Sequence, residues 1–218
     1  MKGLLIKDFK LLFGQKRFFV MICFFGLFFI IANENPISGV SYVTMLFSIF
    51  TLSTISYDEY DNGMSFLMTL PIKRTMYAKE KYVFAGMITL VAGGIASVLA
   101  IGVAKVMEIA LEVEELLLSS VIVMGLSGLI LALAIPIELK FGTEKSRVAM
   151  ILVMGVLFGS GLLLSKGGAY LGIDVTEIFT KIMALDEKIL ASVAFLIWSI
   201  LIFISYMVCV NIIKNKEF

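Results

Sequence analysis

Charged and apolar side chains gather in residues 57–82, where their types and order suit a binding surface. An acidic cluster opens this stretch and a basic cluster closes it; the members are Asp58, Glu59 and Asp61, and then Lys73, Arg74, Lys79 and Lys81. Asn62 and Gly63 offer a turn or a helix N-cap after the acids. Residues 64–70 then form an apolar segment too short to cross a bilayer, which ends at Pro71 because proline lacks an N–H group.

Two interpretations of this apolar segment remain open from the residues alone. A loop that merely joins two membrane helices has no need for Phe66, Leu67 and Met68 in contact with water. Their presence favours a docking surface for another protein. The same residues would equally suit a helix that rests on the surface of the membrane.

The composition identifies a membrane protein. Of the 218 residues, 60% are hydrophobic and only 16% are charged, whereas an average soluble domain has roughly 45–50% and 25%. A net charge of +1 argues against nucleic acid as a partner, because nucleic acid requires a concentrated basic surface.

The residue types disfavour catalysis and metal binding. The chain has no histidine, which removes the commonest general base and a frequent metal ligand. Cys23 and Cys209 fall in apolar runs, so neither a structural disulfide nor a cysteine metal site is expected. Residues 142–146 faintly echo a phosphate-binding loop, but the GxxxxGK[ST] spacing is missing. Any ATP hydrolysis must therefore come from another chain.

Six apolar segments predict an all-α, polytopic membrane domain over residues 18–218. Their approximate bounds are residues 18–32, 39–57, 82–106, 116–137, 148–165 and 189–213, and a spanning helix needs about 20 residues. A short inner loop over residues 138–147 is expected to join the fourth and fifth segments. No charged residue lies near the middle of a segment, which disfavours a transporter driven by an ion gradient.

The distribution of basic residues predicts the orientation. All but four of the 18 Lys and Arg residues fall in segments that would lie on the same side as both termini; the exceptions are Lys105, Lys166, Lys181 and Lys188. Because basic residues concentrate in cytoplasmic loops, both termini and residues 57–82 are expected in the cytoplasm.

Residues 1–17 are expected to form an amphipathic helix on the inner membrane surface. One apolar face is continuous at helical spacing, formed by Leu5, Ile6, Phe9, Leu12 and Phe13. Lys7, Asp8 and Lys10 are expected on the opposite, polar side. The continuous face favours this interpretation over a frayed basic tail.

Two further features have no assigned role from the sequence. A hydroxyl face on the second segment, formed by Ser41, Thr44, Ser48 and Thr51, suits close helix packing better than a translocation path, although both are open. The outer loop over residues 166–188 is expected to hold a short amphipathic helix that begins near Asp174, either as part of the transport machinery or resting on lipid.

The acidic cluster, the short apolar helix, the Leu70-Pro71-x-x-Arg74 pattern and the Lys81-Tyr82 pair together resemble a permease subunit of the ABC-2 type. The resemblance is greatest to the small six-helix permeases that include exporters of phenol-soluble modulins and other peptides. In that family this stretch is a coupling helix that docks on an ATPase subunit. The resemblance thus implies a coupling helix within residues 58–75, with contacts from Glu59, Asn62, Phe66, Leu67, Leu70, Pro71 and Arg74.

The same resemblance implies a function. The chain would be the membrane-spanning subunit of an ATP-binding-cassette exporter, multi-pass in the plasma membrane of a prokaryote, moving an amphipathic peptide or similar hydrophobic substrate outward. ATP and Mg²⁺ would bind a separate ABC ATPase, so the chain itself would be no enzyme and hold no cofactor. A second copy or a paralogue and membrane lipid would be its other partners. The alternative is a non-transporting scaffold or assembly factor, which leaves the cytoplasmic apolar patch unexplained.

Overall fold

The computed structural model describes residues 1–60, 63–170 and 187–216, and over these residues it contains helices and no strand. The helices are α1 (Lys2–Gly14), α2 (Lys16–Asn33), α3 (Pro36–Glu59), α4 (Gly63–Thr69), α5 (Arg74–Val106), α6 (Val113–Tyr170) and α8 (Glu187–Asn215). Five stretches are long and apolar enough to cross a membrane: α2, α3, α5, residues 113–156 of α6, and nearly all of α8. The all-helical, multi-pass class predicted from the sequence is thereby confirmed.

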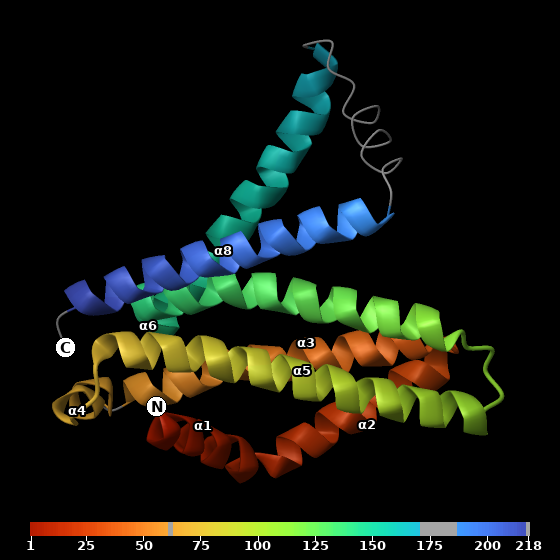
Figure 1. The fold of residues 1–218 in the computed structure, drawn as a ribbon, viewed down its shortest axis with the longest axis horizontal. Coiled ribbons are helices and arrows are strands. Elements are labelled where there is room, and N and C mark those ends of the chain that lie inside the picture. Colours follow the sequence, from red (N-terminus) through yellow and green to blue (C-terminus); the bar gives the residue numbers. More distant parts are fainter. Residues whose placement is uncertain (61–62, 171–186, 217–218) are drawn as a thin grey trace.

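Helix α3 is the centre of the bundle. It packs against α2, α5 and the first half of α6, while α8 lies across α5 and α6 (Figure 1). The N-terminus of α3 is set locally: the Asn35 side chain accepts a hydrogen bond from the Ile37 N–H group, and Pro36 occupies the first turn. Both residues suit these positions, because an Asn cap satisfies a free N–H group and proline has none to satisfy.

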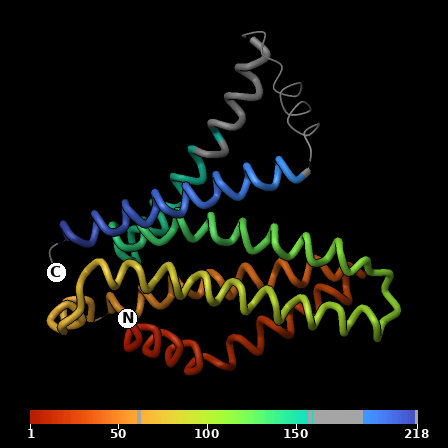
Figure 2. Tube along the Cα trace, viewed as in Figure 1, coloured from red at the N-terminus to blue at the C-terminus, as the bar shows by residue number. Residues whose placement is uncertain are grey.

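The fourth and fifth predicted segments meet more sharply than expected. The expected separation of two helices lies within residues 138–147, but a loop of that length is absent, because the two helices meet at a single non-helical residue, Gly142, at φ 72° and ψ 171°. Glycine alone adopts such a conformation without steric cost. The polar residues around it are good helix formers, so the helix resumes at once. Beyond Gly142, α6 turns back and leaves the bundle at an angle (Figures 1 and 2).

One end of the bundle gathers most of the functional candidates. Both termini, α4 and the break in α6 lie at this end, whereas the α2–α3 turn and the α5–α6 connection lie at the other (Figure 1). That both termini lie on one side of the membrane remains a prediction. That this side is the cytoplasm remains a prediction from the basic residues.

The amphipathic helix α1 lies against the bundle in a register that differs from the expected one. The expectation that Asp8 lies on the polar side is wrong, because Asp8 and Leu4 are buried against the bundle. Ile6 and Phe13 of the predicted apolar face are exposed, whereas Phe9 packs edge-on to Phe84 and Leu12 packs against a buried core. The reason is that Asp8 finds a buried cationic partner, described below.

Close approach of two glycines joins α2 to α3. A Cβ atom at Gly39 would lie 2.3 Å from Ile30 Cγ1 and 2.7 Å from the Gly26 carbonyl oxygen.

We predict that Gly39→Ala destabilises the protein by about 1–3 kcal/mol, because the backbone of α2 would have to move. Gly94→Ala is the control, since a Cβ there meets open space. The two variants are compared by denaturant unfolding in detergent, and equal stabilities would contradict the packing.

Candidate functional site

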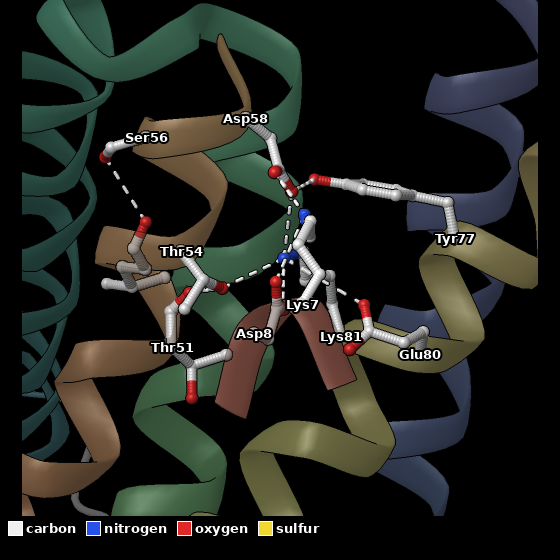
Figure 3. A network of polar contacts seen from close by, with 10 residues as sticks. Lys7, Asp8, Thr51, Thr54, Ser56, Asp58, Tyr77, Glu80 and Lys81 are labelled. Atoms are coloured by element: carbon white, nitrogen blue, oxygen red, sulfur yellow. Dashed lines mark hydrogen bonds and ion pairs between the residues drawn. The ribbon is translucent and has the colours of Figure 1, made fainter. Parts of the chain in front are cut away.

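A cluster of buried charged side chains ties three helices together at the end of the bundle that holds the termini (Figure 3). We call it the ion cluster, and it consists of Lys7 and Asp8 from α1, Asp58 from α3, and Glu80 and Lys81 from α5. Four of the five residues are buried, and Lys7 is half-buried. Because a buried charge is costly unless paired, these groups constrain how α1, α3 and α5 meet.

Lys81 is the centre of the ion cluster. Its Nζ lies 2.5 Å from Asp8 Oδ2 and 3.0 Å from Asp58 Oδ2, and it donates a 2.9 Å hydrogen bond to Thr54 Oγ1. An ammonium group has three N–H donors, so these three oxygens use all of them. One side chain of α5 thereby fixes one residue of α1 and two residues of α3.

Asp58 also accepts hydrogen bonds from two residues other than Lys81. Its Oδ1 accepts a hydrogen bond from Lys7 Nζ, and its Oδ2 accepts one from the Tyr77 hydroxyl at 2.9 Å. Burial by itself would lower the pKa of Lys7, but the carboxylates of Asp58 and Asp8 outweigh that effect and raise it. Lys7 therefore stays charged, and α1 is held to α3 as well as to α5.

The sequence indicates some members of the ion cluster but not that they lie together. Asp58 and Lys81 were assigned to separate acidic and basic clusters, and the hairpin formed by α3, α4 and α5 brings them together. Asp8 was expected on the polar side of the N-terminal helix, and Glu80 was not singled out. One signal could have found the cluster: Lys81 falls on the same helical stripe as the buried Ala78 and Ala85, and a lysine on a buried stripe requires an acidic partner.

Helix α4, the predicted coupling helix, has one buried face and one exposed face. Met64 and Leu67 are buried in a core that also holds residues of α1, α3, α5, α6 and α8. Phe66 is 68% exposed and Leu70 is 42% exposed, and Pro71 is exposed as well. The short helix thus rests on the ends of most of the bundle and presents a large aromatic side chain outward.

Glu59, at the end of α3, bonds to the break in α6. Its Oε2 accepts hydrogen bonds from the Thr143 N–H group at 3.0 Å and the Thr143 hydroxyl at 3.2 Å. Its Oε1 lies 3.0 Å from Lys216 Nζ, which also donates to the Leu139 carbonyl. A carboxylate is well placed there, because the N–H groups that begin a helix lack partners and carry partial positive charge. We call this contact between Glu59, Thr143 and Lys216 the α6 joint.

Arg74 is occupied within the chain. Its guanidinium donates to the carbonyl oxygens of Ile213, Lys214 and Lys216, at the C-terminal end of α8. This contact anchors α8 to the start of α5. Of the other predicted coupling residues, Glu59 is also bonded within the chain, at the α6 joint. Asn62 lies outside the described residues, and contact with an ATPase stays a prediction for Phe66, Leu67, Leu70 and Pro71.

The hydroxyl face of α3 is turned into the bundle. Thr44, Ser48 and Thr51 are buried, Ser41 is partly buried, and Ser48 shares a 2.9 Å hydrogen bond with Thr89 of α5. This arrangement within one chain agrees with the packing interpretation.

The predicted outer helix near Asp174 lies outside the described residues. Over the part of the chain that the structure describes, no three His, Cys, Asp or Glu residues are placed to hold a metal ion.

Comparison with known proteins gives one match. A family model described as "ABC-2 family transporter protein" matches residues 3–214. No curated protein matches the chain, and no solved structure does. The match extends from α1 to the end of α8 and so includes the ion cluster, α4 and the Glu59 and Thr143 positions of the α6 joint.

The ion cluster predicts a large effect of removing its central cation. Lys81→Met leaves Asp8 and Asp58 buried without their shared partner, which should destabilise the protein by about 3–5 kcal/mol. Lys79→Met, two residues earlier on the exposed side of α5, is the matched control and should leave stability unchanged. Denaturant unfolding of both purified variants measures the difference. Equal stabilities would show that the cluster does not hold the helices together.

Proposed function

Because the chain belongs to the ABC-2 family of transporter proteins, we propose that it is the permease subunit of an ATP-binding-cassette exporter whose α4 docks on a separate ATPase. The observation that carries this proposal is the two-sided character of α4. Its buried face contacts the core where five other helices meet, and its outer face presents Phe66. Exposed aromatic residues backed by a packed core are typical anchors of protein interfaces.

The α6 joint supports a route for transmitting motion from the ATPase. Glu59 lies four residues before α4 begins, and it bonds directly to the break at which α6 changes direction. A displacement of α4 would therefore act on the angle between the two halves of α6. The ion cluster would keep α1, α3 and α5 moving together during that displacement.

The proposed substrate class is an amphipathic peptide or a similar hydrophobic molecule. The long helices are apolar. Charged residues lie toward the ends of α2, α3, α5 and α8, and in α6 they also gather around the break at Gly142. Such helices suit an apolar or amphipathic molecule better than a small ion, which needs polar groups at membrane depth. A second copy of the chain or a paralogue would complete the path, and the ATPase would hold ATP and Mg²⁺.

The docking role of α4 is tested by placing a charge on its exposed face. Phe66→Asp should weaken binding of the partner ATPase at least tenfold, because an anchor residue contributes about 2 kcal/mol or more. It should also abolish stimulation of ATPase activity in reconstituted vesicles while the chain still inserts. Val106→Asp adds the same charge at an equally exposed apolar position at the other end of the fold. Full stimulation by the Phe66 variant would refute the docking role, and a non-transporting scaffold would then be the better account.

The transmitting role of the α6 joint makes a separate prediction. Glu59→Ala should leave ATPase binding within about twofold of wild type, because Glu59 faces the joint, but should reduce substrate transport per ATP hydrolysed several-fold. Glu115→Ala, an exposed carboxylate at the far end of the bundle, is the control. Transport and hydrolysis are measured together in vesicles. A Glu59 variant that binds and transports normally would separate the joint from the transport cycle.

A further inference from the structure

The ion cluster holds more negative than positive side chains. Lys7 and Lys81 supply two cations, whereas Asp8, Asp58 and Glu80 supply three carboxyl groups (Figure 3). Glu80 is fully buried, so water cannot compensate its charge. A buried carboxylate without compensation is strongly unfavourable and normally takes up a proton.

Glu80 is also the member of the ion cluster whose carboxyl oxygens have no hydrogen-bond partner among the described residues. The three donors of Lys81 point to Asp8, Asp58 and Thr54, and the nearest Glu80 oxygen is 3.9 Å from Lys81 Nζ. Within the described part of the chain, neither Glu80 oxygen has a hydrogen-bond partner, and Asp8 Oδ1 has only an ion-pair contact, with Lys7 Nζ at 3.1 Å. The Glu80 carboxyl group is within hydrogen-bonding reach of Asp8, and one hydrogen between the two groups would satisfy both.

We propose that Glu80 is a proton-binding site and that its protonated carboxyl group donates a hydrogen bond to Asp8 Oδ1. The bound proton supplies the missing donor and reduces the charge of the cluster from −1 to zero. Asp8 is the acceptor, because its carboxylate is paired directly with Lys81 and its Oδ1 lies 3.1 Å from Lys7 Nζ.

The surrounding groups leave Glu80 as the member that takes the proton. Asp58 accepts from Lys7 and Tyr77 and is paired with Lys81, so its ionised form is stabilised by three donors. From α6, Glu138 already accepts a hydrogen bond from Ser56 of α3. From α8, Tyr206 packs edge-on to Tyr82. Tyr77, Lys81, Lys7 and Asp8 complete the titratable surroundings.

Loss of the proton has a structural consequence. Ionised Glu80 on α5 would repel ionised Asp8 on α1 across a buried contact, where charges interact strongly. The contact between α1 and α5 is then weakened as the pH rises through the titration of Glu80. The site thereby links proton binding to how firmly α1 is held on the bundle, independently of the substrate that the protein moves.

Infrared difference spectroscopy of the purified protein tests the site directly. The probe is the C=O stretch of a protonated carboxyl group, recorded in lipid nanodiscs over a pH series on wild type, Glu80→Gln and the exposed control Glu115→Gln. Wild type and the control should both show this band at neutral pH and lose it at higher pH, and Glu80→Gln should lack it. Unfolding by denaturant should become easier with rising pH in wild type but not in Glu80→Gln.

Asp8→Asn is a second variant that covers failure of the Glu80 variant to fold. It removes the neighbouring charge and provides an amide N–H donor, so the protonated band of Glu80 should move to lower pH. A wild-type spectrum without a protonated band at neutral pH would overturn the proposal. So would a band that survives in Glu80→Gln, or one whose titration is unchanged in Asp8→Asn.

Discussion

The structure depends on one buried cation. Lys81 has no access to solvent, and its three donors are used by Asp8 on α1 and by Thr54 and Asp58 on α3. Desolvation makes a buried ion pair a weak source of net stability, but breaking one is costly. The principal effect is therefore on geometry. Helix α1 has few other inward contacts, and its register on the bundle follows from where Asp8 must lie.

The same constraint makes the helices at the end of the bundle that holds the termini into one connected unit. The ion cluster joins α1, α3 and α5, while α4 closes the connection between α3 and α5 and packs on the common core. One residue beyond Asp58, the side chain of Glu59 bonds to the break in α6. Asp58 and Glu59 are consecutive residues of α3, and they connect the unit formed by α1, α3, α4 and α5 to the break in α6. This arrangement is what a permease moved by a separate ATPase would need.

Much of the fold could be predicted from the sequence, because bilayer length and apolar composition nearly determine spanning helices. The position and short length of α4 followed from Gly63 and Pro71 in the same way. The predicted loop over residues 138–147 failed because its polar residues are also good helix formers, and only Gly142 departs from helical geometry. Within the candidate site, Phe66 is exposed, as both a docking surface and a helix resting on the membrane would require. The inward turn of Asp8 could not be predicted, because it depends on Lys81, 73 positions along the chain.

The central claim is that α4 receives the force of an ATPase and passes it through α3 to the hinge in α6. Electron cryo-microscopy of the chain bound to its ATPase, with and without a non-hydrolysable ATP analogue, tests this claim most directly. We expect α4 to be seated in a groove of the ATPase. Between the two states α1, α3 and α5 should move as one body, while the second half of α6 changes its angle at Gly142. An ATPase bound elsewhere, or an α6 angle that is the same in both states, would contradict the account.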